Sequence, residues 1–309
     1  MINRIIHKAV KGFNNTCLMD KIVEQKINYH IKEESLRNSA LHSTEKGVER
    51  FNNQNENIIV SLTTYNKRIY DVYLVIETLL NQTYKPNKII LWLAEDEFNE
   101  HTIPLLLKRQ QTRGLEIGYC KDLKSYKKLI PTLEKYPDHI IVTADDDVLY
   151  PFDLIENLYK EYVKNKRCIY YGRGHKMKWD KKGRLCRYQD WILEYKGEEK
   201  SQIHFPTGCA GILYPPQCFH EDILREDLFL KLAPTADDVW FKAMSLLKGF
   251  ACKRVSFGNK YIDIEEYQDI ALYHNNIGNK MNDIQIKQVF DYYNLWEKLR
   301  NYYYDKKNN

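Results

Sequence analysis

Apolar and polar residues alternate in blocks from residue 57 to about residue 164, in a pattern typical of a parallel α/β sheet. Short runs of apolar or β-branched residues predict buried strands at 58–64, 88–94, 115–120 and 140–143. Apolar residues at helical spacing predict helices between them, over 69–80, 103–113 and 124–135. Because strands and helices alternate with short connections, we expect parallel strands joined by right-handed crossovers.

The pattern is less regular after residue 151. Helices are predicted over 153–164, 239–248 and 283–300, and strands over 168–171, 212–214 and 251–257. No Gly-x-Gly-x-x-Gly follows the first strand, and the chain has no Gly-Lys-Ser/Thr loop. Dinucleotide dehydrogenases and P-loop enzymes are therefore disfavoured.

The first 56 residues read as an appendage. Apolar residues over 2–13 fall near helical spacing with basic residues beside them, which fits a basic amphipathic helix on an anionic membrane surface. A helix packed on the main domain, or a frayed terminus, is the alternative. Residues 33–56 are polar and predict a linker. We expect a helical appendage with linker over 1–56, a main domain over 57–282 and a C-terminal helix over 283–309.

Composition limits the class of protein. The chain has 309 residues, 43% of them hydrophobic and 29% charged, which indicates a soluble globular protein with room for one large core. Its net charge of +5 permits a negative ligand or a peripheral membrane contact but does not indicate nucleic acid. The seven cysteines include no Cys-x-x-Cys pair, so a disulfide framework or zinc site is not expected. No apolar run is long enough to span a membrane and the N-terminus lacks a signal-peptide core, so we expect a cytoplasmic protein. The sequence does not indicate its oligomeric state.

An acidic triplet, Asp145, Asp146 and Asp147, directly follows the apolar strand at 140–143. Adjacent carboxylates repel one another unless a cation lies among them. Open α/β sheets bind ligands at the carboxyl ends of their strands, and carboxylates there suit Mg²⁺ or Mn²⁺. The alternative is a solvated acidic turn, which so apolar a preceding strand disfavours.

Three further polar clusters accompany the triplet. They are Asp237 with Asp238, Asp122 with Lys124, Lys127 and Lys128, and His274 followed by Lys280. Each has an ordinary alternative: a helix N-cap, a lysine-rich exposed helix face, and a polar loop residue. Together they suggest a divalent cation that neutralises a diphosphate, lysines that stabilise a leaving group, and a separate carboxylate that acts as a base.

With these motifs the chain resembles the GT-A glycosyltransferases, close to the family-two type that uses nucleotide-diphosphate sugars, over about residues 57–280. The resembling stretches are 60–68, 122–128, 143–147, 207–211 and 236–240. The resemblance implies a GT-A, Rossmann-like α/β fold with a mostly parallel sheet flanked by helices. It also implies Mn²⁺- or Mg²⁺-dependent, inverting sugar transfer in surface polysaccharide synthesis. The donor would be a UDP-sugar and the acceptor a hydroxyl of a glycan or lipid-linked glycan.

The resemblance further implies roles for individual residues. Those implied to bind the nucleotide sugar are Thr63, Tyr65, Arg68, Asp122, Lys127, Asp145, Asp146, Gly208 and Gly211. Those implied to hold the metal are Asp145, Asp147 and His274, although family-two members often lack the histidine. Asp238 is implied to be the base and Asp237 to bind the acceptor. These two roles are exchangeable, because the chain has Asp where the family motif has Glu.

The sequence leaves two other functions open. A metal-dependent phosphohydrolase or nuclease also clusters carboxylates, but it needs a positioned water, and a nuclease needs a denser basic patch than +5 suggests. A non-catalytic nucleotide-binding module would bind the nucleotide without transferring a sugar.

Overall fold

The computed structural model describes residues 23–24, 26–51, 56–258, 261–264 and 281–308. The chain forms two compact units, Met1–Ser43 and Thr44–Asn309, and the expected division into 1–56, 57–282 and 283–309 stays a prediction. The amphipathic helix expected over 2–13 lies outside the described residues. Within them, no helix has the length and apolar character needed to cross a membrane.

In the first unit a helix covers residues 23–24 and 26–42. The linker expected over 33–56 is therefore wrong for residues 33–42. Their polar residues form helix-stabilising pairs instead, since Arg37 donates to Glu33 at 2.9 Å, four positions away. Residues 44–51 belong to the second unit, where the N–H of Gly47 donates to the Arg113 carbonyl at 2.9 Å.

The described part of the second unit contains a seven-stranded sheet in the order β3-β2-β1-β4-β7-β6-β8. Strands β1 to β4 are mutually parallel, β6 is parallel to β8, and β7 runs antiparallel to both β4 and β6. The strands are β1 (Ile58–Thr63), β2 (Lys88–Ala94), β3 (Leu115–Cys120), β4 (Ile140–Thr143), β6 (Cys168–Lys176), β7 (His204–Tyr214) and β8 (Ala251–Arg254). The predicted mostly parallel α/β sheet is confirmed.

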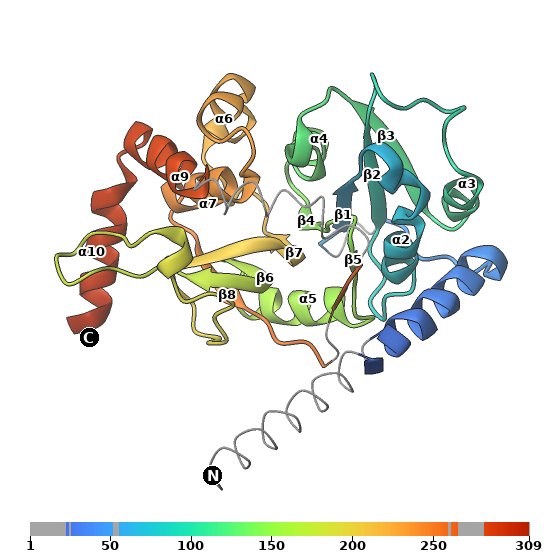
Figure 1. Ribbon diagram of the computed structural model, residues 1–309, viewed down its shortest axis with the longest axis horizontal. Coiled ribbons are helices and arrows are strands. Elements are labelled where there is room, and N and C mark those ends of the chain that lie inside the picture. Colours follow the sequence, from blue (N-terminus) through green and yellow to red (C-terminus); the bar gives the residue numbers. More distant parts are fainter. Residues whose placement is uncertain (1–22, 25, 52–55, 259–260, 265–280, 309) are drawn as a thin grey trace, which may run out of the picture. The chain divides into compact units, whose positions relative to one another are not determined.

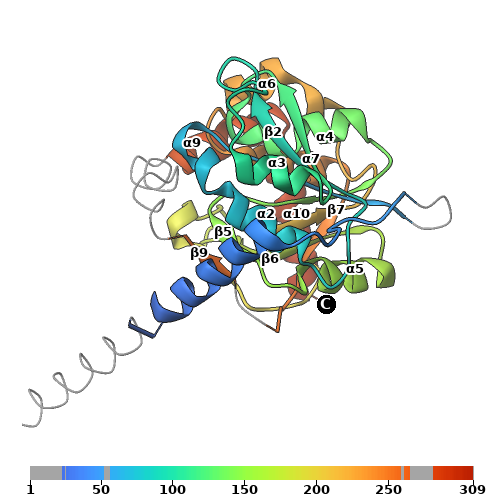
Figure 2. The same cartoon turned by 90° about the vertical axis from the view of Figure 1, so that its right-hand side faces the viewer.

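Helices flank this sheet (Figure 1). The α-helices are α2 (Val72–Leu80), α3 (Leu105–Gln111), α4 (Ile130–Lys135), α5 (Leu154–Lys164), α6 (Glu226–Leu232), α7 (Asp237–Leu247), α9 (Met281–Tyr292) and α10 (Leu295–Asn308). The 3₁₀ helices are η1 (Asn66–Tyr70), η2 (Lys124–Lys128), η3 (Tyr188–Asp190) and η4 (Glu221–Leu224). Helices α2 and α3 pack together beside the β1–β3 part of the sheet (Figure 2), while α5 and α7 both pack on β7. This cover explains why the β1 residues Ile58–Leu62 are buried on both faces.

Several segments differ from the predicted pattern. The C-terminal helix expected over 283–300 is divided into α9 and α10, because Asn294 between them has a left-handed φ of 51°. The strand expected over 251–257 ends at Arg254.

The helix expected over 124–135 is divided into η2 and α4, because Lys124 has a left-handed φ of 55° and Pro131 lies in the first turn of α4. Strands β6 and β7 extend well beyond the apolar cores at 168–171 and 212–214. The extensions carry polar residues and glycines, which mask a strand in the sequence.

The strand order brings distant motifs together. The acidic triplet follows β4, and β7 lies next to β4 with Thr143 opposite Ile212. The β7 residues before Ile212 therefore continue past the end of β4, alongside Asp145. A short second sheet then pairs β5 (Val148–Leu149) with β9 (Ile262–Asp263).

A buried ion pair joins α2 to the end of α3. The Arg113 guanidinium donates to both carboxylate oxygens of Glu77 at 2.7 and 2.8 Å, and Glu77 is fully buried. Gln110 adds a neutral hydrogen bond at 2.8 Å. Removing one partner of such a pair leaves an uncompensated charge in the core.

We predict that Arg113→Met lowers the free energy of unfolding by about 3–5 kcal/mol, because it leaves the Glu77 charge without its cation. Urea denaturation measures the loss. The control is Lys160→Met, which breaks an exposed pair with Glu156 at 2.5 Å and should leave the free energy of unfolding almost unchanged. Equal losses in the two variants would contradict the prediction.

Candidate active site

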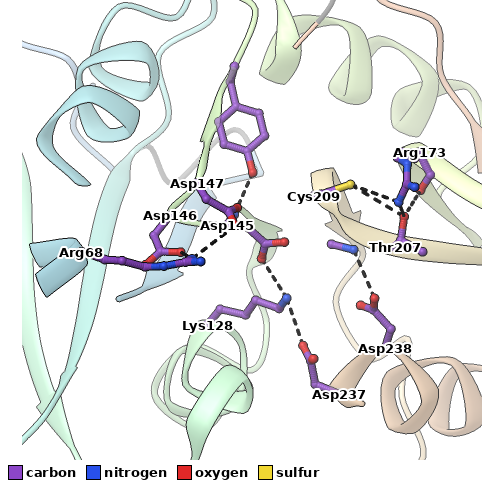
Figure 3. Close-up of polar contacts among 12 residues, drawn as sticks. Arg68, Lys128, Asp145, Asp146, Asp147, Arg173, Thr207, Cys209, Asp237 and Asp238 are labelled. Carbon is purple, nitrogen blue, oxygen red and sulfur yellow. Dashed lines mark hydrogen bonds and ion pairs between the residues drawn. The ribbon is translucent and has the colours of Figure 1, made fainter. Parts of the chain in front are cut away.

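Asp146, the middle residue of the triplet, ties the end of β4 to the end of β1. Its carboxylate accepts a hydrogen bond from Thr64 Oγ1 at 2.6 Å. It also accepts one from Arg68 Nη1 at 2.7 Å (Figure 3). The same nitrogen of Arg68 lies 3.2 Å from Asp147 Oδ2. Burial raises the pKa of Asp146, and the Arg68 guanidinium opposes that rise. Asp146 and Arg68 are both buried, so their contact fixes the geometry around the triplet.

The Lys128 ammonium lies between two carboxylates from distant parts of the chain (Figure 3). Its Nζ donates to Asp145 Oδ1 at 2.8 Å and lies 3.0 Å from Asp237 Oδ2. Asp145 follows β4, whereas Asp237 is the first residue of α7. Burial lowers the pKa of Lys128, but the nearby carboxylates outweigh burial and hold that pKa well above its usual value. Lys128 is therefore a charged link between the triplet and α7.

Asp238, the second residue of α7, is partly free to react. Its Oδ2 accepts a hydrogen bond from the Gly208 N–H at 3.4 Å, and its Oδ1 is shielded from solvent with no partner among the described residues. Burial, with the carboxylates of Asp237 and Asp145, raises the pKa of Asp238 to about 7, against the opposing effect of Lys128. A carboxyl group that titrates near neutral pH suits proton transfer.

Glycines allow β7 to pass close to this cluster. A Cβ on Gly208 would lie 2.6 Å from Lys128 Nζ, closer than atoms pack, and 3.0 Å from Asp145 Oδ2, which is a tight contact. Gly211 has a φ of +78°, and a Cβ there would lie 3.0 Å from Leu154 Cδ1. The glycines at 208 and 211 therefore meet steric requirements of the site.

Asp147 has the chemistry of a metal ligand. Burial and the carboxylates of Asp145 and Asp146 raise its pKa to about 6, against the effect of Arg68. Crowded carboxylates of this kind suit a divalent cation. Within the described ranges, however, no three His, Cys, Asp or Glu side chains are arranged to hold a metal, and His274 lies outside those ranges. The metal site stays a prediction.

A second polar cluster lies on β6 and β7 (Figure 3). The Arg173 Nη1 atom lies 3.2 Å from Thr207 Oγ1 and 3.5 Å from Cys209 Sγ. The Nε of the same side chain donates to Glu194 Oε1 at 3.1 Å. Burial raises the pKa of Cys209 to about 12, so the thiol is neutral. Because Thr207 and Cys209 flank Gly208, these contacts hold the strand whose N–H reaches Asp238.

The other predicted binding residues lie at the ends of β1 and β3. Thr63 donates to a β2 carbonyl at 2.8 Å, and the ring of Tyr65 is exposed with the Arg68 guanidinium 5.1 Å from its centroid. Asp122 accepts a hydrogen bond from the buried Lys127, so these two residues pair with each other. Contacts of all these residues with a nucleotide stay predictions.

Several residues of the site were not singled out by the sequence. Lys128 belonged to a predicted lysine cluster, but Lys127 was the residue given a role. Thr64 lies inside the resembling stretch 60–68, where it was given no role, and Tyr150 follows the triplet. The Tyr150 hydroxyl accepts a hydrogen bond from the Asp145 N–H at 2.7 Å. Arg173 stood in a polar stretch without a recognisable motif. Position within or beside a motif was the one available signal for the first three.

Comparison with known proteins gives little to identify the chain. No protein-family model matches it, and no curated protein matches it. Among solved structures it is similar to S. aureus TarS 1–349, at 15% identity and a TM-score of 0.43. It is likewise similar to S. aureus TarS 1–349 in complex with UDP, at 12% identity and a TM-score of 0.43. In both cases the similarity covers 66% of this chain and 59% of the other. The function of this chain must therefore be inferred from the residues of its own candidate site.

We predict that Asp238→Asn becomes more stable relative to the wild type as pH rises. The folded-state pKa of about 7 lies above the ordinary 3.8, so stability from the protonated group is present at low pH and is lost as pH rises through 7. The amide has no such loss. Between pH 5 and pH 8 the difference should grow by roughly 2 kcal/mol.

Urea denaturation at both pH values tests this prediction. Asp138→Asn, at an exposed position, is the control and should keep a constant difference from the wild type. A constant difference for Asp238→Asn as well would mean that the buried carboxyl group titrates normally.

Proposed function

We propose that this chain is a metal-dependent GT-A glycosyltransferase. It moves a sugar from a nucleotide-diphosphate donor, a UDP-sugar, to a hydroxyl of a glycan or lipid-linked glycan, with inversion, in surface polysaccharide synthesis. The observation that carries the proposal is the convergence of Asp145, from the acidic triplet, and Asp237, the neighbour of Asp238, on one buried lysine, Lys128. The convergence puts a candidate cation site and a candidate base on neighbouring segments at the carboxyl end of β4.

The chain's own residues supply most of the chemistry. Asp145 and Asp147 would hold Mn²⁺ or Mg²⁺, and the bound ion would neutralise the donor diphosphate. Asp238 accepts the proton of the acceptor hydroxyl as that oxygen attacks the anomeric carbon, and the bond between that carbon and the nucleoside diphosphate breaks to release the diphosphate as the leaving group. Its pKa of about 7 lets it be ionised and basic near neutral pH. The Gly208 N–H orients the carboxylate, and Lys128 holds Asp237 beside it.

A thermal-shift screen of nucleotides, with and without Mn²⁺, tests the proposed class. UDP and one or more UDP-sugars should raise the melting temperature in the presence of Mn²⁺, since a ligand at about 100 times its Kd adds roughly 2.7 kcal/mol of stability. A stabilised chain that then hydrolyses phosphodiesters would be a phosphohydrolase. Nucleotide binding without transfer to any acceptor and without donor hydrolysis would indicate a binding module.

We predict that Asp238→Asn lowers turnover by about 10²–10⁴-fold, the usual contribution of a general base. Affinity for UDP should be retained, because the substitution leaves the triplet intact. Steady-state rates and calorimetry measure the two effects, with Asp138→Asn as the matched surface control. Unchanged turnover would remove Asp238 from the mechanism.

We predict that Asp147→Ala abolishes the Mn²⁺-dependent part of UDP binding, because the substitution removes one of the two described carboxylates assigned to the metal. Calorimetry with and without Mn²⁺ reads this directly. Asp138→Ala controls for the loss of one surface charge. If Asp147→Ala binds UDP with wild-type metal dependence, the metal lies elsewhere.

A further inference from the structure

A small cavity lies beneath the candidate base. Its volume is about 10 Å³, and Asp238 lines it together with Tyr214, Lys242, Ser245 and Cys252. A cavity of about 10–15 Å³ has room for one water molecule, which needs two or more polar partners. Empty cavities are usually apolar, whereas the residues that line this one include Asp238 and Lys242 beside the apolar Ile169, Pro206 and Phe241.

Lys242 is a buried cation in the wall of this cavity. It lies on α7 and is 3% exposed. Its Nζ lies 3.5 Å from Cys252 Sγ, and no carboxylate in the described part of the chain forms an ion pair with it. Burial raises the pKa of Cys252, so the neutral thiol does not supply a counter-charge. A buried charge is costly without a compensating partner.

In the described ranges, Asp238 lacks a hydrogen-bond donor at one of its carboxylate oxygens. Its Oδ1 is buried without a hydrogen-bond partner among the described residues, while Oδ2 is held by Gly208. Asp238 and Lys242 are four positions apart on α7, so both project from the same face of the helix. They line one cavity without forming a direct ion pair.

We propose that one ordered water fills this cavity and joins Asp238 Oδ1 to Lys242 Nζ, which makes Lys242 a positioning residue for the base. The catalytic part of this inference rests on the proposed function, whereas the water itself does not. The water satisfies the buried oxygen, and the ammonium behind it favours the ionised carboxylate.

The other groups that face Asp238 do not replace this contact. Asp237 on the same helix and Asp145 at the end of β4 are negative, and the Tyr214 hydroxyl on β7 is neutral. Lys128 is positive, but it already lies between Asp145 and Asp237. The Gly208 N–H is used at Oδ2. Lys242 therefore supplies Asp238 with a positive charge that is not shared with Asp237 or Asp145.

A crystal structure of the whole chain at high resolution tests the water directly. We expect one ordered water within hydrogen-bond distance of Asp238 Oδ1 and Lys242 Nζ. An empty cavity, or Oδ1 bonded to another group, would overturn the inference. This readout needs no substrate, so it is independent of whether the chain transfers a sugar.

The pH dependence of turnover tests the role of Lys242. In Lys242→Met the acid limb of the kcat profile should move up by about one pH unit, which lowers kcat about tenfold on that limb. The donor KM should not change. Lys248→Met, the same substitution at an exposed position at the end of α7, should leave the profile in place. A wild-type profile in Lys242→Met would overturn the positioning role, even with the water present.

A second variant keeps the test decisive if Lys242→Met does not fold. Ser245→Thr adds one methyl group to the cavity wall and keeps the hydroxyl that donates to the Lys242 carbonyl at 2.8 Å. By displacing the water it should move the acid limb in the same direction. An unchanged limb, with the methyl group in the cavity, would also contradict the role. Absence of transfer in the wild type would instead contradict the proposed function.

Discussion

One buried ammonium joins the two halves of the candidate site. Lys128 is 6% exposed and contacts Asp145 and Asp237, which are separated by about ninety residues of chain. A lysine buried to this degree is stable only when carboxylates compensate its charge. Lys128 lies on η2, which packs against β1 and β2. The position of η2 thus determines where α7 begins. The same contact sets the position of Asp238, the next residue of that helix.

Strand β7 runs directly beside the ion pair between Lys128 and Asp145, which accounts for the glycine at position 208 of this strand. It passes so close to them that a side chain at position 208 would displace the Lys128 ammonium and crowd Asp145. In return, the Gly208 backbone N–H comes within reach of Asp238. Arg173 holds the residues on either side of Gly208. Charge pairing therefore fixes the centre of the site, and backbone geometry transmits that position to the candidate base.

The sequence predicted the parts of the structure that depend on local pattern. Apolar runs marked β1 to β4, because strands of a covered parallel sheet are buried on both faces. The sequence motifs grouped the triplet with Asp237 and Asp238 as one candidate site, and in the structure Lys128 contacts both Asp145 and Asp237. The ion-pair partners of Lys127 and Lys128 could not be predicted from the sequence. The left-handed turn at Lys124 breaks the expected helix and directs Lys127 to Asp122 and Lys128 to Asp145, and no periodicity predicts such a turn.

The charge of the site connects its two proposals. Five aspartates, three in the triplet and two on α7, face the cations Arg68 and Lys128, so full ionisation would leave a net charge of 2 − 5 = −3. Burial, together with this excess of negative charge, raises the pKa of both Asp147 and Asp238. Lys242 reduces the excess to −2, which is the charge that one divalent cation neutralises. The water-linked lysine would thus let Asp238 ionise beside an occupied metal site, as its proposed role as a base requires.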